Sequence, residues 1–406
     1  MNKENKTHAC YSALIVIALA ASACLVCAMS DGIRNNYGIM LGAIIENSGL
    51  TYASVSLVLA AGQLFFGMIQ PLFGIIAQKK GNTFALLSGV FMTLAGLLLL
   101  PHCKSALPLL FCLGFLLPAG TGATSYGILI GSITPKIPAE TVSLVSGFVN
   151  ASSGVGNAVL SPLLQTLLQK GGISAAMSVL CVPTVLMIPV CLFVGRSGKK
   201  SDEKDKSAQP QRASELFSSA FKNRTYRLIM AAFFTCGFHM ALISNHFPSQ
   251  LKSYGITAEK AALAFSIYGA VTMAGSVLSG WLCGRFKMKN VQGAYFGSRV
   301  FVTVIFLLLS KNNASAFLWA AFLGLTGAAT VPPVSGLINR EFGAEKLATL
   351  YGFAFFVHQI GAFLGAWFAG ICVERFGIYE PIWIADLILC ASASLASFCI
   401  HEKRSL

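Results

Sequence analysis

The chain has 406 residues, of which 55% are hydrophobic and 11% are charged, whereas soluble domains usually carry about 25% charged residues. A water-soluble fold of this size would expose too much apolar surface, so the composition excludes an ordinary soluble protein and indicates that lipid is the solvent. The net charge of +14 does not indicate nucleic-acid binding, because the basic residues form no patch with interleaved aromatic side chains.

The first apolar run begins near residue 11 and follows a short basic segment. It is similar to a signal peptide, but it continues to Met29 and further apolar runs follow, which favours an uncleaved first helix. Cys24 and Cys27 lie in this run at a spacing typical of metal or redox sites. No second pair accompanies them, so we interpret the 12 scattered cysteines as small apolar filler.

Apolar runs of about 20 residues predict helices that cross a bilayer. In chain order, the first set is expected at 11–38, 52–73, 83–100, 106–131, 141–168 and 173–194. The second set is expected at 224–248, 258–283, 291–310, 315–338, 347–372 and 380–401. The prediction is an all-α membrane protein with twelve transmembrane helices in two pseudo-symmetric six-helix bundles.

A charged segment separates the two sets. Residues 195–222 hold 11 of the 44 charged residues and end in an amphipathic stretch at 214–221, which is typical of a solvated linker. We therefore expect an N-terminal bundle at 1–194, a cytoplasmic linker at 195–222 and a C-terminal bundle at 223–406.

The basic residues also predict the orientation of the chain. If the N-terminus is cytoplasmic, the tails and connections on that side hold 21 of the 29 Lys and Arg residues, and the connections on the other side hold 6. Cytoplasmic loops of membrane proteins carry this excess of positive charge. Both termini are therefore expected in the cytoplasm.

Glycines recur at a nearly constant offset in the two halves. Gly147 and Gly156 are followed 205 residues later by Gly352 and Gly361, and a glycine after the second span recurs after 206 residues. Such internal repetition is typical of transport proteins built from two related halves.

Ionisable residues inside the spans are the candidates for function. An arginine near the bilayer centre costs about 2.5–3.5 kcal/mol on insertion scales, so it should face a cavity or a partner. The candidates are Asp31, Arg34, His239, His246, Arg299, His358 and Asp386.

Arg299 is the most informative of these residues. Tyr295, Arg299 and Thr303 follow one another at four-residue spacing and form one polar stripe on an apolar helix. A guanidinium in a cavity is a planar fork that matches a carboxylate. The alternative is a structural ion pair with Asp31 or Asp386.

Arg34 shares a helix face with Asp31 and Tyr37, so it could contact a solute or form an intrahelical ion pair with Asp31. His239 and His246 share a face seven residues apart, and histidines in a cavity can bind or relay protons. The alternative for both is a hydrogen-bonded packing role. Asp31, His239, His246 and Asp386 are candidates for coupling or gating, and a structural role is the alternative for Asp386.

Several motifs resemble a known family. They lie at 32–38 (GIRNNYG), 120–131, 331–333, 352–361 and 374–379. On these residues the chain resembles the major facilitator superfamily, and within it bacterial monocarboxylate-transporter-like and oxalate:formate-antiporter-like proteins. The resemblance covers nearly the whole chain and implies the twelve-helix fold predicted above.

The resemblance also implies roles for particular residues. It implies that Arg299 binds a carboxylate, although the family places this arginine in the eighth helix and our count places it in the ninth. Tyr126 resembles a substrate-contacting tyrosine, and His358 is nearest to a lysine of oxalate:formate antiporters. We add Tyr295, Asn36 and Tyr37 to the substrate-binding candidates.

Two departures from the family pattern concern coupling and gating. Tyr295 stands where proton-coupled relatives often have an acid, and Gln78 stands where the loop signature after the second helix has an aspartate. These departures leave proton symport and anion exchange as alternatives.

The sequence therefore predicts a secondary active transporter of a small organic anion, a monocarboxylate or dicarboxylate, in the bacterial plasma membrane. It is expected to work by alternating access as a monomer, with protons or a counter-anion, without cofactor, metal or nucleic acid. One alternative is an efflux carrier for drugs or amphiphiles. A membrane sensor or intramembrane enzyme is a further alternative, but the sequence has no paired membrane aspartates and no His-Glu-x-x-His motif for such chemistry.

Overall fold

A computed structural model describes residues 13–196 and 213–402. The first half contains α1 (Ala13–Asn35), α2 (Tyr37–Ser48), α3 (Tyr52–Lys80), α4 (Asn82–Leu99), α5 (Ala106–Leu109), α6 (Leu117–Ala123), α7 (Tyr126–Ile133) and α8 (Ala139–Arg196). The second half contains α9 (Ala213–Lys222), α10 (Arg224–Ser253), α11 (Ala258–Arg285), α12 (Met288–Leu308), α13 (Asn313–Gly327), α14 (Val331–Phe342), α15 (Ala344–Phe376) and α16 (Glu380–Phe398). Short 3-10 and π segments join some of these helices, and no strand occurs in the described ranges.

The helices confirm the predicted membrane fold. Eleven helical stretches of the described chain are long and apolar enough to cross a membrane. One of them, α8, has 58 residues and is broken by non-helical backbone at Gly171 and Gly172. Gly172 has a φ of +64°, which a glycine adopts without steric cost. Since α8 contains two predicted spans, at 141–168 and 173–194, the count of twelve is approximately confirmed.

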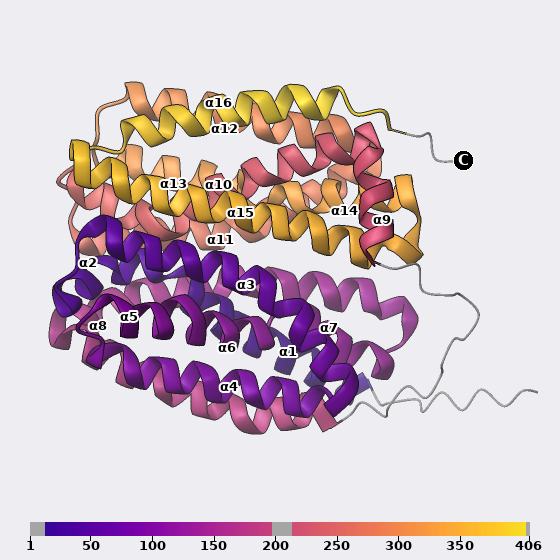
Figure 1. Cartoon of the computed structure of the whole chain (residues 1–406), viewed down its shortest axis with the longest axis horizontal. Coiled ribbons are helices and arrows are strands. Elements are labelled where there is room, and N and C mark those ends of the chain that lie inside the picture. The colour runs from indigo at the N-terminus through magenta and orange to yellow at the C-terminus, as the bar shows by residue number, and fades with distance from the viewer. Residues whose placement is uncertain (1–12, 197–212, 403–406) are drawn as a thin grey trace, which may run out of the picture.

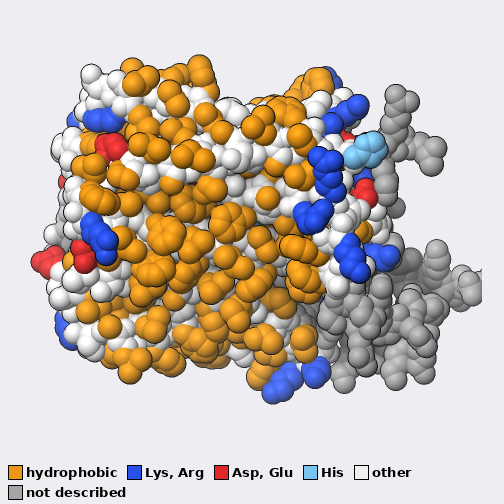
Figure 2. Space-filling view, turned by 45° about the horizontal axis from the view of Figure 1, so that its top comes forward, with side chains coloured by type: hydrophobic (Ala, Val, Ile, Leu, Met, Phe, Trp, Pro, Cys, Tyr) orange, Lys and Arg blue, Asp and Glu red, His pale blue; other side chains and the backbone are white. Residues whose placement is uncertain are grey.

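The two halves lie side by side with their helices along the long axis of the molecule (Figure 1). The chain enters and leaves the described ranges at one end, which holds Arg196, Ala213 and Glu402 and which we call the linker end. The other end, which we call the distal end, holds the turns at 49–51, 254–257 and 377–379. Figure 2 shows an apolar band across the molecule, with Lys and Arg side chains gathered toward the linker end.

Several helices extend beyond their predicted limits. The second span was predicted to end at residue 73, but α3 continues to Lys80, and the eleventh extends from Ala344 to Phe376 rather than over 347–372. Hydropathy detects the segment in lipid, whereas the helix continues through polar turns such as Gln78 and Lys79. The spans predicted at 106–131 and 315–338 are not single helices, because the backbone breaks near Thr124 and at 328–330.

Close glycine contacts confirm that the halves repeat one design. A Cβ added to Gly156 would lie 1.8 Å from the carbonyl oxygen of Ala28, so α8 and α1 touch backbone to backbone. A Cβ added to Gly361 would lie 2.1 Å from the carbonyl oxygen of Phe234, which brings α15 and α10 together in the same way. Gly361 follows Gly156 after 205 residues, and Phe234 follows Ala28 after 206 residues.

A pair of side-chain contacts repeats with the same offset. The hydroxyls of Ser30 and Thr124 lie 2.5 Å apart, and 206 residues later the Cys236 thiol lies 3.0 Å from the hydroxyl of Thr330. Each contact joins the first span of a half to the break in the fourth span of the same half. An offset of 206 therefore identifies matching positions in the two halves.

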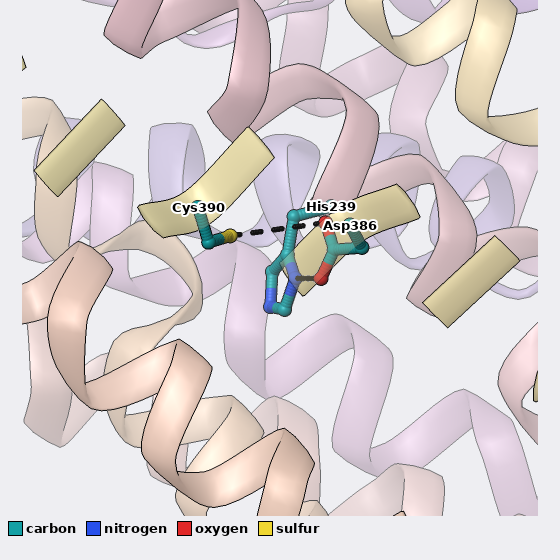
Figure 3. Close-up of side chains that lie close together, drawn as sticks. All are labelled: His239, Asp386 and Cys390. Carbon is teal, nitrogen blue, oxygen red and sulfur yellow. Dashed lines mark hydrogen bonds and ion pairs between the residues drawn. The ribbon is translucent and has the colours of Figure 1, made fainter. Parts of the chain in front are cut away.

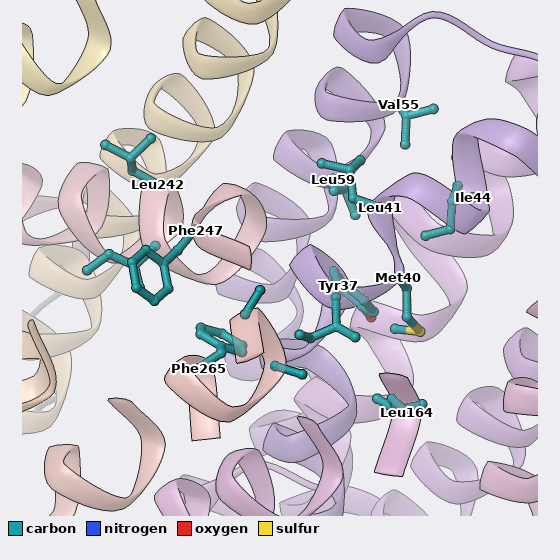
Figure 4. Packing of buried hydrophobic residues seen from close by; sticks show 14 of the residues in the cluster. Tyr37, Met40, Leu41, Ile44, Val55, Leu59, Leu164, Leu242, Phe247 and Phe265 are labelled. Carbon is teal, nitrogen blue, oxygen red and sulfur yellow. The ribbon is translucent and has the colours of Figure 1, made fainter. Parts of the chain in front are cut away.

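Apolar packing closes the distal end. One buried cluster, which we call the distal cluster, contains residues of both halves (Figure 4). Its members include Tyr37, Leu41, Val55, Leu164, Leu242, Phe247 and Phe265. Nearer the linker end the cores are separate, since one draws its members from the first half and another from the second.

Polar contacts between the halves follow the same distribution. At the distal end, the hydroxyls of Tyr52 and Tyr379 lie 2.7 Å apart, and the Ala53 N–H donates to the Glu374 carboxylate at 2.7 Å. Nearer the middle of the molecule, Asn157 and Ala158 of α8 are bonded to Phe265 and Ser266 of α11, whereas the buried clusters nearer the linker end each belong to one half. The structure is therefore closed at the distal end and parted toward the linker end.

Candidate solute site

Arg299 lies on α12 and is buried, with 1% of its surface exposed. One terminal nitrogen donates to the carbonyl oxygens of Thr326 and Gly327, each at 2.7 Å. These carbonyls belong to the last turn of α13, where the span breaks and leaves carbonyls without helical partners. Arg299 thus points into the protein and not toward lipid.

The first half has a small residue at the matching position. At the offset of 206, Arg299 corresponds to Thr93, which packs directly against Gly120 in the fourth span. That span also breaks, but without an arginine beside it. The fourth span therefore breaks in both halves, but only the second half has an arginine at the matching position of its third span.

Much of the guanidinium remains without a partner. Nε and the other terminal nitrogen are buried and have no hydrogen-bond partner among the described residues. The expected alternative, a direct ion pair with Asp31 or Asp386, is not formed in the described part of the chain. Asp386 acts on Arg299 electrostatically, but its carboxylate is bonded to His239. Donors are thus left for another acceptor.

Arg34 approaches the same region from the first half. Its guanidinium donates to the side-chain oxygen of Gln63 at 3.1 Å, lies 3.7 Å from Asp31, and stacks 4.2 Å above the ring of Phe66. The predicted intrahelical pair with Asp31 is therefore present. Tyr268 of α11, whose hydroxyl lies beside Gly327, is within electrostatic range of both Arg34 and Arg299.

A thiol and an imidazole complete the side of the site in the second half. Cys236 on α10 lies 3.7 Å from the bonded nitrogen of Arg299 and also interacts with His358 on α15. The His358 ring packs on Phe355 and leaves its Nδ1 without a partner among the described residues. Cys236 is thus a shared neighbour of His358 and Arg299, and their joint role in solute binding stays a prediction.

The remaining candidates lie in three kinds of surroundings. Tyr126 on α7 is 38% exposed and lies within electrostatic range of Tyr351 in the other half. We therefore place it where the two halves are parted. Tyr37 and Tyr295 are buried with hydroxyls that have no partner in the described ranges. Asn36 differs, because its amide bonds Asn157 and its oxygen accepts from Ser161.

These bonds change the interpretation of Asn36. Its amide nitrogen also donates to the carbonyl of Gly32, so the side chain ties the break between α1 and α2 to α8. The structure therefore gives Asn36 a packing role instead of the predicted solute contact. Asn157 of α8 makes interhelical hydrogen bonds, since its oxygen accepts from Asn36 and its amide donates to the carbonyl of Phe265 on α11.

Two histidines of α10 lie in different surroundings. His239 Nδ1 lies 2.7 Å from Asp386 of α16, and both side chains are buried (Figure 3). His246 belongs to the distal end, where its Nε2 donates to the carbonyl of Ala366 at 2.8 Å and its Nδ1 accepts from Tyr52 at 3.1 Å. His239 is therefore a candidate for coupling and His246 for gating.

The structure corrects two interpretations of the sequence. Arg299 lies on α12, which is the ninth span in chain order, so it does not occupy the eighth helix that the resemblance implies. Cys236 is not simple apolar filler, because it contacts Arg299 and Thr330. Sequence analysis also missed Tyr268 and Gln63, and only their polarity within apolar helices could have indicated them.

Comparison with known proteins supports the fold. The sequence profile described as Major Facilitator Superfamily matches residues 21–366. The chain is similar to the "Oxalate:formate antiporter" of Oxalobacter formigenes, with 24% identity over 93% of this chain and 90% of that protein. It is also similar to "Monocarboxylate transporter 12" of Rattus norvegicus, with 23% identity over 80% of this chain and 72% of that protein.

Solved structures show the same architecture at lower identity. A D-xylose-proton symporter superimposes with a TM-score of 0.75 and 14% identity, over 96% of this chain and 99% of the other. A bacterial homologue of the lysosomal transporter Spinster gives a TM-score of 0.74 and 15% identity, over 96% and 98%. With two related helical halves that meet at one end, and a profile match over most of its length, this chain belongs to the Major Facilitator Superfamily of membrane transporters.

Proposed function

We propose that this transporter carries a small organic anion, a monocarboxylate or dicarboxylate, by alternating access. The observation that carries the proposal is the buried guanidinium of Arg299, whose Nε and one terminal nitrogen have no partner in the described ranges. A buried cation with free donors is stabilised by an anion that accepts its hydrogen bonds. A carboxylate is the group that matches a planar guanidinium.

The arrangement of the two arginines supports transport between the halves. Arg34 belongs to the first half and Arg299 to the second, and both act on Tyr268. An anion that contacts both would add an attraction between the halves. Binding can shift a conformational equilibrium only through such differential contacts.

Charge distribution supports an orientation. The Lys and Arg side chains gather toward the linker end in Figure 2, and the positive-inside rule assigns such an end to the cytoplasm. In a bacterial plasma membrane both termini would then be cytoplasmic, and the present conformation would face inward. The named activities of the oxalate:formate antiporter and monocarboxylate transporter 12 fit the same class of solute.

Counterflow in proteoliposomes tests the proposal. Vesicles loaded with unlabelled lactate, formate or oxalate should take up the labelled compound through the wild-type protein. Arg299→Ala should reduce this uptake at least tenfold, because a hydrogen bond to a charged group contributes about 1.5–3 kcal/mol. Arg285→Gln is the matched control, since Arg285 is exposed at the end of α11.

The outcomes separate the alternatives. Normal carboxylate counterflow by a folded Arg299→Ala protein would refute the site. Transport of amphiphilic cations with no response to carboxylates would favour the efflux carrier. Arg299→Lys distinguishes charge from shape, because lysine keeps the charge but loses the planar fork.

A further inference from the structure

We propose that His239 and Asp386 form the proton-binding site of this transporter, so that one proton moves with each carboxylate anion. The inference rests on the proposed function and chooses symport from the two coupling modes that the sequence leaves open. It is carried by three observations: the geometry of the pair, the apolar residues at the matching positions, and the balance of buried charge around Arg299.

The pair has one nitrogen available for a proton. His239 Nδ1 lies 2.7 Å from Oδ2 of Asp386 (Figure 3), so Nδ1 carries the hydrogen when the carboxylate is ionised. Nε2 is buried and has no partner among the described residues. A proton that reaches the site adds to the lone pair of Nε2, and the imidazolium formed remains bonded to the ionised Asp386.

Groups from every neighbouring helix bear on this proton. From α16, the thiol of Cys390 lies 3.8 Å from Oδ1 of Asp386, and from α12, Arg299 interacts with both Asp386 and Cys390. On α10 itself Cys236 lies one turn away. Of the other helices packed against α10, α15 places Tyr351 and His358 against Phe233, and α3 places Tyr52 against His246.

The fold does not need a polar pair at this place. At the offset of 206, His239 and Asp386 correspond to Ile33 and Leu180, which are both about 1% exposed and belong to the distal cluster. The first half therefore builds the same packing with apolar side chains. Apolar residues can often replace a buried ion pair without loss of stability. We therefore infer that the pair in the second half is kept for a function.

Charge balance connects the pair to the solute. Among the described residues that are buried as a whole, the Lys, Arg, Asp and Glu residues are Arg299, Asp386 and Lys136. The buried side chain of Glu402 is paired with Arg340 at the linker end. Lys136 is remote, because it donates to the carbonyl of Val194 near the linker end. Arg299 and Asp386 cancel each other, so a carboxylate that enters alone leaves one excess negative charge. A proton on His239 restores neutrality, and burying both together costs less than burying either alone.

The pair is organised for a proton rather than for a metal ion. The ligand atoms of His239, Asp386 and Cys390 lie within 4.8 Å of one another. However, Nδ1 and Oδ2 are bonded to each other directly, so in this arrangement these two atoms do not face a shared metal ion.

Parallel measurements of solute and proton movement test the inference. Purified full-length protein is reconstituted into vesicles that contain a trapped pH-sensitive dye, with the membrane potential clamped. Addition of lactate, formate or oxalate should acidify the lumen in proportion to uptake. In His239→Gln and Asp386→Asn, acidification and net uptake should fall together by at least tenfold more than counterflow falls. His102→Gln, at an exposed histidine at the very end of the third span, should behave as the wild type.

A double variant keeps the test independent of folding. His239→Ile with Asp386→Leu copies the apolar pair of the first half, so it should remain monodisperse and lose proton movement. Counterflow without acidification in the wild type would overturn this inference and leave the carboxylate site intact. Unchanged acidification per anion in the variants would also overturn it. Absence of carboxylate counterflow in the wild type would overturn the proposed function and this inference together.

Discussion

Removal of one hydroxyl at the distal end should change the conformational equilibrium of the transporter. The hydroxyl of Tyr379 lies 2.7 Å from that of Tyr52, and this bond joins the two halves across 327 residues of sequence. Tyr379→Phe deletes the bond and keeps the ring, which packs in the distal cluster. When the distal end opens, both hydroxyls meet water, so the variant destabilises the closed state alone.

The expected magnitude follows from the loss of one hydrogen bond. A neutral hydrogen bond contributes about 0.5–1.5 kcal/mol net. Tyr52 keeps its second contact, to Nδ1 of His246, so no buried hydroxyl is left without a partner and the central value of about 1 kcal/mol applies. That value corresponds to about a fivefold rise in the ratio of distally open to distally closed molecules.

Amide hydrogen exchange measures this ratio in lipid nanodiscs. Peptides that cover 49–56 and 374–381 should exchange about fivefold faster in Tyr379→Phe, because their protection depends on the closed state. Tyr254→Phe is the matched control, since its hydroxyl lies at the same end but bonds Gln250 and Glu380 within one half. The reasoning would be refuted if both variants exchanged alike, or if Tyr379→Phe exchanged as the wild type.

Three further predictions concern packing. Gly156→Leu should prevent isolation of monodisperse protein, because its Cβ would lie 1.8 Å from a carbonyl oxygen, whereas Gly147→Ala has open space and should elute normally in size-exclusion chromatography. Asn157→Leu removes interhelical hydrogen bonds worth about 1–2 kcal/mol in total, so a thermal-shift assay should show a lower midpoint; an unchanged midpoint would contradict the assigned role. In a Cys10→Ser background, a maleimide should label exposed Cys399 first. Equally rapid labelling that survives Cys399→Ser would contradict the lower exposure of the other described thiols.

The sequence predicted the spans better than their interruptions. Apolar runs mark the chain wherever lipid surrounds it, so the order of the helices agrees with the structure. Breaks at Thr124 and at 328–330 leave no mark in hydropathy, because single side chains satisfy the carbonyls beside them. At the first break the Thr121 and Thr124 hydroxyls donate to carbonyls of the preceding turn. The carbonyls of Thr326 and Gly327, for example, are satisfied by Arg299 from another helix.

The candidate site was predicted as single residues and not as contacts. Four-residue spacing placed Tyr295, Arg299 and Thr303 on one face, and all three are buried in the structure. Neither that spacing nor composition could show that Arg299 bonds backbone carbonyls, or that His239 meets Asp386 across 147 residues of sequence. Such pairings depend on how the helices pack. Helix packing in lipid is set by small residues such as Gly361, and a glycine in the sequence does not show which helix it will contact.

The differences between the halves explain how one repeated scaffold could couple binding to motion. Arg299 in the second half replaces a threonine of the first, and Arg34 of the first half corresponds to Met240 of the second. Each half thus contributes one arginine, and the two arginines lie at positions that the repeat does not relate. A solute that engages both must lie between the halves, where its attraction favours their approach on whichever side is open. At each matching position the other half packs with an uncharged residue, Thr93 or Met240. The fold therefore does not require the two arginines, and an anion that passes between the halves explains their placement better.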